Sequence, residues 1–255
     1  MISFFTTEIL SALLTLTFLE IVLGIDNILF VSIIAGKLSV KEQKKAIAVG
    51  LGMAMILRLV LLLGVSVLMQ MRNPWIKLDN DLIHTEISGQ AVILFLGGLF
   101  LLYKSTKEIY EKVELKGDLH SQSKNQTTLL KAVVQITLIN VVFSVDSILT
   151  ALGMSNGLPY AGWVMGIAIV ISVLIMMLFA RPVGDFVNEH PSLQVLGLSF
   201  LLLIGFMLLA EAAHISHTEI LGQEVGSIPK GYLYFAIAFS LGVEFINMKL
   251  RKNPK

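Results

Sequence analysis

Long apolar segments alternate with short polar connections along the whole chain. Seven of these segments approach the roughly 20 residues that an α-helix needs to cross about 30 Å of hydrocarbon. Their ranges are 7–34, 46–69, 89–103, 129–152, 160–180, 192–213 and 231–248. A helix satisfies its own backbone without water, and these runs lack the weak alternation of a membrane barrel. The pattern therefore predicts an all-α membrane protein with seven transmembrane helices.

The connections carry the helix breakers and most of the charge. Asn73-Pro74 is expected to break the chain within a loop at 70–88, and Arg181-Pro182 to end the fifth helix. The charges at 105–114 alternate at helical spacing, so the third helix is expected to continue into water. The longest connection is 104–131, and an acidic loop at 214–230 follows the sixth segment.

Composition agrees with a membrane protein. The chain has 255 residues, of which 55% are hydrophobic and 15% are charged, whereas an average soluble domain has about 25% charged residues. There is no cysteine, which excludes disulfides and thiolate sites. A net charge of +1 gives no reason to expect nucleic-acid binding. The first apolar run lacks a basic leader and a small-residue cleavage site, so it is expected to be a retained span.

Lysine and arginine are distributed unevenly between the two sets of loops. Fifteen of the 19 basic residues fall in connections on one side, three fall on the other, and Arg58 lies inside the second segment. Loops rich in basic residues stay in the cytoplasm. The count predicts the N-terminus outside and the C-terminus in the cytoplasm.

The first and fourth segments repeat each other. A shift of 120 residues superposes them without a gap, and a shift of 104 aligns the starts of the third and sixth segments. The aligned polar positions are Thr17 with Thr137, Glu20 with Asn140, Gly24 with Ser144, Asp26 with Asp146, and Asn27 with Ser147. Each half would cross the membrane three times. Because three is odd, the second half would start on the opposite side of the membrane and run antiparallel to the first. This predicts a 3+3 inverted repeat, 7–105 and 129–213, with one additional C-terminal helix at 231–248 in a single transmembrane domain.

The repeated motifs place polar groups where they are costly. A charge at the bilayer centre costs about 2.5–3.5 kcal/mol on insertion scales, so such groups persist where they face protein or water. Their carboxylate, amide and hydroxyl oxygens are ligands that suit Mg²⁺, Ca²⁺ and Mn²⁺. The candidate metal ligands are Glu20, Asp26, Asn27, Asn140, Asp146 and Ser147.

Other polar residues have plainer interpretations. Single Asn and Ser residues in spans commonly join helices, and a buried Asp can simply pair with an arginine. Arg58 and Glu244 are secondary candidates for the metal site. Arg58 fits a structural counter-charge better than a ligand, whereas Glu244 lies close enough to a helix end to reach water, which leaves its role open. His214 and His217 suit a solvated loop, although metal capture there stays open.

Four motifs resemble the TerC family of integral membrane proteins. They are L-E-I-V-L-G-I-D-N at 19–27, N-V-V-F-S-V-D-S at 140–147, R-P-V-G-D-F at 181–186 and G-V-E-F-I-N at 242–247. The resemblance covers nearly the whole chain, in the short form of the family. It implies a relation to lysine-exporter-like transporters and an association with Mn²⁺ efflux. The family's acidic motifs correspond here to Glu20, Asp26, Asn27, Asp146 and Ser147. Asn140 departs from the symmetric pattern. The family was named for tellurium resistance, but tellurite is an anion and the acidic core of this chain does not suit it.

Residues and resemblance together predict a secondary transporter that exports Mn²⁺ or a similar divalent cation across the cytoplasmic (inner) membrane. Exchange with H⁺ or Na⁺ is expected because no nucleotide-binding motif is present. The protein is expected to be no enzyme and to hold no permanent cofactor. Its expected partners are the metal ion and membrane lipid, with homo-oligomer formation open. The alternatives are a membrane assembly or partner-binding protein and, less favoured, an intramembrane hydrolase with paired aspartates.

Overall fold

The structure is a computed structural model that describes residues 6–80, 83–114, 128–155 and 160–252. The side chains of a few residues inside helices, Asp26 and Asp146 among them, lie outside the described part. The chain divides into two compact units, and each unit takes residues from both halves of the sequence. The first comprises Met1–Met69 and Ser123–Glu189, and the second comprises Gln70–Gln122 and His190–Lys255.

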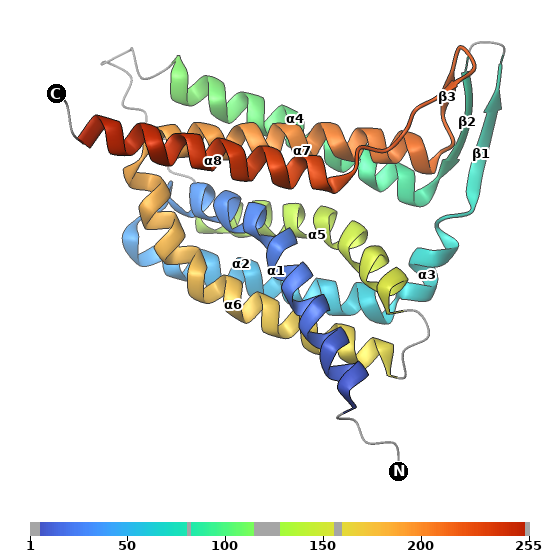
Figure 1. Ribbon diagram of the computed structural model, residues 1–255, viewed down its shortest axis with the longest axis horizontal. Coiled ribbons are helices and arrows are strands. Elements are labelled where there is room, and N and C mark those ends of the chain that lie inside the picture. The colour runs from blue at the N-terminus through green and yellow to red at the C-terminus, as the bar shows by residue number, and fades with distance from the viewer. Residues whose placement is uncertain (1–5, 81–82, 115–127, 156–159, 253–255) are drawn as a thin grey trace. The chain divides into compact units, whose positions relative to one another are not determined.

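The first unit is helical. Its elements are α1 (Thr7–Ala35), α2 (Val40–Leu63), the short α3 (Val65–Gln70) at its edge, α5 (Leu129–Met154) and α6 (Ala161–Glu189). Helix α1 packs most extensively against α6, and α2 packs most extensively against α5. In Figure 1, α1 and α6 run from right to left, whereas α2 and α5 run from left to right.

This packing has the symmetry that the repeat requires of its first two helices. Exchanging α1 with α5 and α2 with α6 turns each main packing pair into the other. The exchanged helices run in opposite directions (Figure 1). The third helices of the two predicted halves, α4 and α7, belong to the second unit. The complete three-helix inverted repeat therefore remains a prediction.

The second unit combines three helices with a small sheet. Its elements are β1 (Pro74–Asp79), β2 (Ile83–Ser88), α4 (Gly89–Val113), α7 (Pro191–Ile215), β3 (Glu219–Ile220), β4 (Gln223–Glu224) and α8 (Lys230–Lys252). Helices α4 and α7 approach closely at two glycines, since a Cβ added to Gly98 would lie 2.7 Å from the carbonyl oxygen of Gly205. Small residues at a crossing let two membrane helices come into backbone contact.

The predicted extension of the third helix is confirmed, because α4 continues without a break to Val113. Several helices start at a side-chain cap. Thr6, Ser88 and Thr128 accept hydrogen bonds from the backbone N–H three residues later, at 3.3, 3.2 and 3.4 Å. Such caps satisfy donors that the first turn of a helix leaves without partners.

The prediction of a purely helical fold is wrong in one respect. The two segments expected to be loops contain strands, which form one antiparallel sheet in the order β1-β2-β3-β4. The β3–β4 turn has Leu221 at φ 54° and Gly222 at φ 76°, and two positive φ angles are typical of a type I′ hairpin turn. The helices remain the main structure.

The prediction that Arg181-Pro182 ends the fifth helix is also wrong, since α6 continues through Pro182 to Glu189. Proline removes one backbone hydrogen bond, which neighbouring groups can offset in a membrane helix. The hydroxyl of Ser32 in α1 donates to the carbonyl of Ala180 at 2.9 Å, and Gly184 lets Ser32 approach α6 closely. Contacts with α1 thus hold both sides of the proline in helical conformation.

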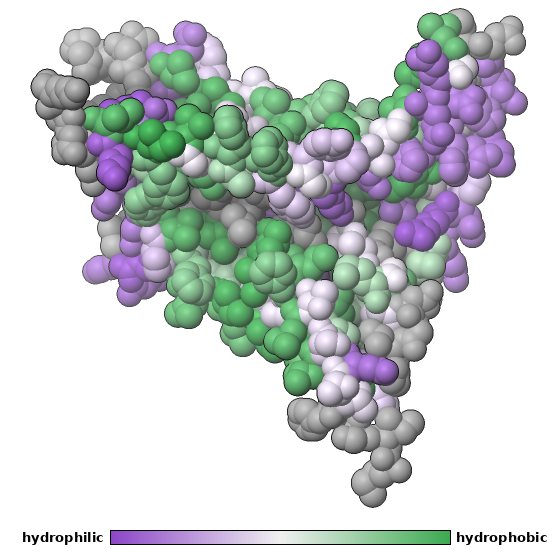
Figure 2. Space-filling view, viewed as in Figure 1, coloured by the Kyte–Doolittle hydropathy of each residue, from purple (hydrophilic) through white to green (hydrophobic). Residues whose placement is uncertain are grey.

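Six helices in the described residues are long and apolar enough to cross a membrane: α2, α4, α5, α6, α7 and α8. Helix α1 has 29 residues and corresponds to the predicted first span, but it is not among the six, so the count of seven is not confirmed. Figure 2 shows hydrophobic residues over much of the visible helix surface and hydrophilic residues gathered over the sheet. The chain is a multi-pass membrane protein by these features.

Candidate functional site

The polar stripes of α1 and α5 are buried inside the first unit. Glu20 and Asn27 of α1 are each 2% exposed, and Asn140, Ser144 and Ser147 of α5 are at most 5% exposed. The two helices contact each other. The stripes therefore face protein, as the cost of polar groups in lipid requires.

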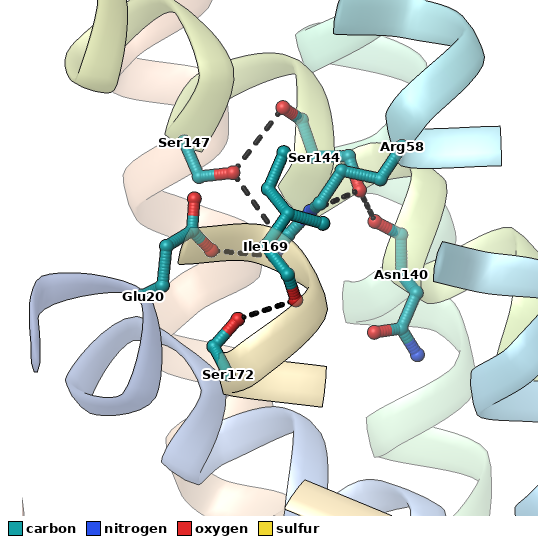
Figure 3. Close-up of polar contacts among 7 residues, drawn as sticks. All are labelled: Glu20, Arg58, Asn140, Ser144, Ser147, Ile169 and Ser172. Atoms are coloured by element: carbon teal, nitrogen blue, oxygen red, sulfur yellow. Dashed lines mark hydrogen bonds and ion pairs between the residues drawn. The ribbon is translucent and has the colours of Figure 1, made fainter. Parts of the chain in front are cut away.

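A buried ion pair occupies the centre of this polar cluster. Arg58 of α2 donates from Nη1 to Oε2 of Glu20 at 2.5 Å, and the two side chains are 6% and 3% exposed. The same guanidinium donates from Nε to Ser144 Oγ and from Nη2 to Ser147 Oγ, both at 3.1 Å. Figure 3 shows these contacts converging on Arg58 from the other helices. One arginine thus links α1, α2 and α5.

The α5 side of the cluster is satisfied within its own helix. Ser144 donates to the carbonyl of Asn140 at 2.5 Å, and Ser147 donates to the carbonyl of Ser144 at 3.3 Å (Figure 3). The side-chain amide of Asn140 donates to the carbonyl of Ile136 at 2.8 Å. Each serine oxygen therefore gives its proton to the backbone and accepts from Arg58. In this arrangement both are ligands of the guanidinium.

Asn27 behaves differently from the other candidates. Its side-chain oxygen is buried and has no hydrogen-bond partner among the described residues. The hydroxyls of Thr17 and Thr137, which the repeat aligns with each other, share this property. A buried acceptor without a partner costs about 1–3 kcal/mol and needs an explanation such as a bound water or ion. Among the described candidates, Asn27 has a fully buried oxygen to which no described residue donates, so this oxygen could accept such a ligand.

The two aspartates lie in the helices that form this cluster. Asp26 is in α1 and Asp146 is in α5, but their side chains lie outside the described residues. Among the residues that are described, no group of three or more His, Cys, Asp and Glu side chains could hold a metal ion. A metal site here would depend on Asp26 and Asp146, and it stays a prediction.

Glu244 belongs to a separate feature in the second unit. It lines a groove of about 340 Å³ between α7 and α8, together with Ser192, Ser199 and Ser240. Its carboxylate accepts a hydrogen bond from Ser192. Glu244 lies in the second unit, and a role for it in metal binding stays a prediction.

His214, near the end of α7, and His217, just after it, lie beside the small sheet. His214 Nδ1 is 3.4 Å from Glu224 Oε1, and His217 has a positive φ of 46° at a turn. Neither belongs to a metal-binding group among the described side chains.

Ser144 is the cluster residue that the predicted ligand set omitted. The repeat aligns it with Gly24, so it carries no acidic signal, but it lies one turn after Asn140 on the same polar stripe. That spacing is the signal that identifies it as a partner for a buried side chain.

Comparisons with known proteins agree along the whole chain. A UPF0053 protein of Haemophilus influenzae is 43% identical over 244 residues, which cover 96% of this chain and 95% of that protein. The UPF0053 inner membrane protein YgdQ of Escherichia coli K12 is also 43% identical, with coverage of 95% and 94%. The UPF0053 inner membrane protein YoaE of the same strain is 41% identical over 96% of this chain but only 44% of its own length.

No solved structure matches this chain. Residues 5–254 match the family described as the integral membrane protein TerC family, and this range includes the buried cluster of α1, α2 and α5. The chain therefore belongs to the TerC family of integral membrane proteins.

Proposed function

We propose that the protein is a secondary transporter that exports Mn²⁺ or a similar divalent cation, in exchange for H⁺ or Na⁺. The observation that carries the proposal is the buried side-chain oxygen of Asn27, which has no hydrogen-bond partner among the described residues and directly follows Asp26. A buried acceptor oxygen without a described protein donor suits a ligand that binds and leaves again. Its aligned partner Ser147 directly follows Asp146 in α5.

The surroundings of this oxygen support a cation rather than an anion. The donor set consists of oxygen atoms, which hard divalent cations prefer. An anion would need basic groups or helix N-termini, and the one basic side chain of the cluster, Arg58, is engaged by Glu20. The antiparallel course of α1 and α5 supports the inverted-repeat plan, in which the transport site lies near the midplane. The name of YgdQ places that relative in an inner membrane, and we propose the same location here.

A membrane assembly or partner-binding role is the second candidate. The observation that favours it is Arg58, which joins three helices through one ion pair and two hydrogen bonds. Polar contacts of this kind can exist solely to hold helices together. A deletion strain separates the candidates, because only loss of an exporter makes growth sensitive to added Mn²⁺.

Transport of radioactive Mn²⁺ into everted membrane vesicles tests the proposal directly. Vesicles with the protein should accumulate Mn²⁺ when a proton or Na⁺ gradient is imposed, and vesicles with Asp146→Asn at equal protein level should not. Competition by Mg²⁺, Ca²⁺ and Zn²⁺ then ranks the cations. Equal accumulation with and without the protein would reject the transporter proposal.

A further inference from the structure

The two halves of the repeat differ at one charge, and the structure shows what that charge touches. Glu20 of the first half is aligned with Asn140 of the second. Glu20 binds Arg58, whereas the side-chain amide of Asn140 donates to its own helix. Helix α6, which corresponds to α2 in the repeat, has no charged residue from Ala161 to Ala180. The half that lacks the glutamate also lacks the arginine.

The space beside Glu20 offers little to a metal ion. It is a narrow crevice with no room for a water molecule, and its other lining residues are Leu16, Ile148, Ala151, Met165, Ala168 and Ile169. Ser172 of α6, close to this region in Figure 3, donates its hydroxyl to the carbonyl of Ile169 at 2.9 Å. A hard divalent cation takes about six or more oxygen ligands, and the described lining of the crevice supplies the carboxylate of Glu20 and no second one.

We propose that Glu20 and Arg58 form a charge-neutral clamp that fixes α1 and α2 on α5, and that neither residue is a metal ligand. In the predicted spans 7–34, 46–69, 129–152 and 160–180, the charged residues that lie more than five positions from a span end are Glu20, Asp26, Arg58 and Asp146. With the clamp neutral, Asp26 and Asp146 provide the negative charge within these spans, and two carboxylates would balance the charge of one divalent cation. This inference rests on the proposed function and names the residues that set the charge of its site.

The clamp can be tested by replacing Glu20 and Arg58 with the residues found at the aligned positions of the second half. The variants are Glu20→Asn, Arg58→Leu and the double change, each measured for thermal unfolding in detergent with and without MnCl₂. Each single change leaves one buried charge without a partner and should lower Tm strongly. The double change removes both charges and should recover most of the lost Tm. Its apparent Mn²⁺ affinity should stay within about threefold of the wild type.

The exposed pair of Lys77 and Glu86 provides a matched control. Its N–O distance is also 2.5 Å, but the two side chains are 63% and 26% exposed. Lys77→Leu should therefore change Tm little. The comparison separates the effect of burial from the loss of an ion pair at the same distance.

Two results would overturn the clamp. The first is a double variant whose Tm is no higher than that of the less stable single variant. If the second double variant, Glu20→Gln with Arg58→Met, gives the same result, the two charges do not offset each other. If a stable double variant loses about tenfold or more in Mn²⁺ affinity, as Asp146→Asn should, Glu20 is a ligand. A wild-type protein whose Tm does not respond to MnCl₂ would instead reject the proposed function, and the metal-free series would still decide the clamp.

Discussion

The side-chain oxygen of Asn27 allows a prediction in which stability and function change in opposite directions. Asn27 is 2% exposed, and its oxygen has no partner among the described residues. Asn27→Leu keeps a similar size and removes that oxygen. Since a buried acceptor without a partner costs about 1–3 kcal/mol, the metal-free protein should become more stable by up to that amount. Apparent Mn²⁺ affinity should fall about tenfold or more, equivalent to about 1.4 kcal/mol.

Gln90→Met is the control for this prediction. The side-chain oxygen of Gln90 is also buried without a partner among the described residues, but it lies in the second unit. The change should raise stability and leave Mn²⁺ binding unaltered. Stability is read from denaturant titration in detergent micelles without metal, and binding from equilibrium titration with radioactive Mn²⁺.

Two outcomes would refute the reasoning about Asn27. Lower metal-free stability of Asn27→Leu would mean that the oxygen is satisfied in the protein. Higher stability with unchanged Mn²⁺ affinity would mean that the oxygen is buried without a partner but is not a ligand. The second outcome would leave the transport proposal without its main support.

Three further predictions concern packing, pH and orientation. Gly98→Ala should cost about 1–3 kcal/mol, because its Cβ would meet the Gly205 carbonyl, whereas Gly242→Ala, with nothing within 4 Å, should gain up to about 1 kcal/mol; denaturant titration compares them. The Lys77 hydrogen bond lowers the pKa of Glu86, so the β1–β2 hairpin should lose hydrogen-exchange protection as pH falls below the ordinary glutamate pKa of about 4.3, and Lys77→Met should weaken that dependence. With Asp79→Cys and Ser39→Cys as single thiols, an impermeant maleimide should label only position 79 in intact cells, and the reverse would invert the predicted orientation.

The helices could be predicted from the sequence because lipid leaves few alternatives for a long apolar run. The described helix starts at Thr7, Gly89 and Leu129 coincide with the predicted ones. Pro182 misled the prediction because its effect depends on α1, through Ser32, which is distant in sequence. The β1–β2 hairpin was missed although Ile83, Thr85 and Ile87 alternate with polar residues, since a polar loop was the simpler interpretation.

The site could be predicted in outline but not in its pairing. The repeat identified α1 and α5, and their described polar residues are buried as expected. The sequence alone could not show that Arg58 forms its ion pair with Glu20. That pairing depends on how α2 packs against α1 and α5. The sequence placed Glu20 and Asp26 together among the candidate ligands, and the ion pair of Glu20 with Arg58 is the observation behind the proposal that Glu20 is not a ligand.

The most direct test of the account is equilibrium binding of Mn²⁺ to the purified protein and to its Asp26→Asn and Asp146→Asn variants. Each change keeps the size of the side chain and removes one of the two charges proposed to hold the cation. The account predicts saturable binding of Mn²⁺ to the wild type and a loss of affinity of about tenfold or more in each variant, with the fold intact. Wild-type affinity in both variants would contradict it and leave Asp26 and Asp146 as packing residues.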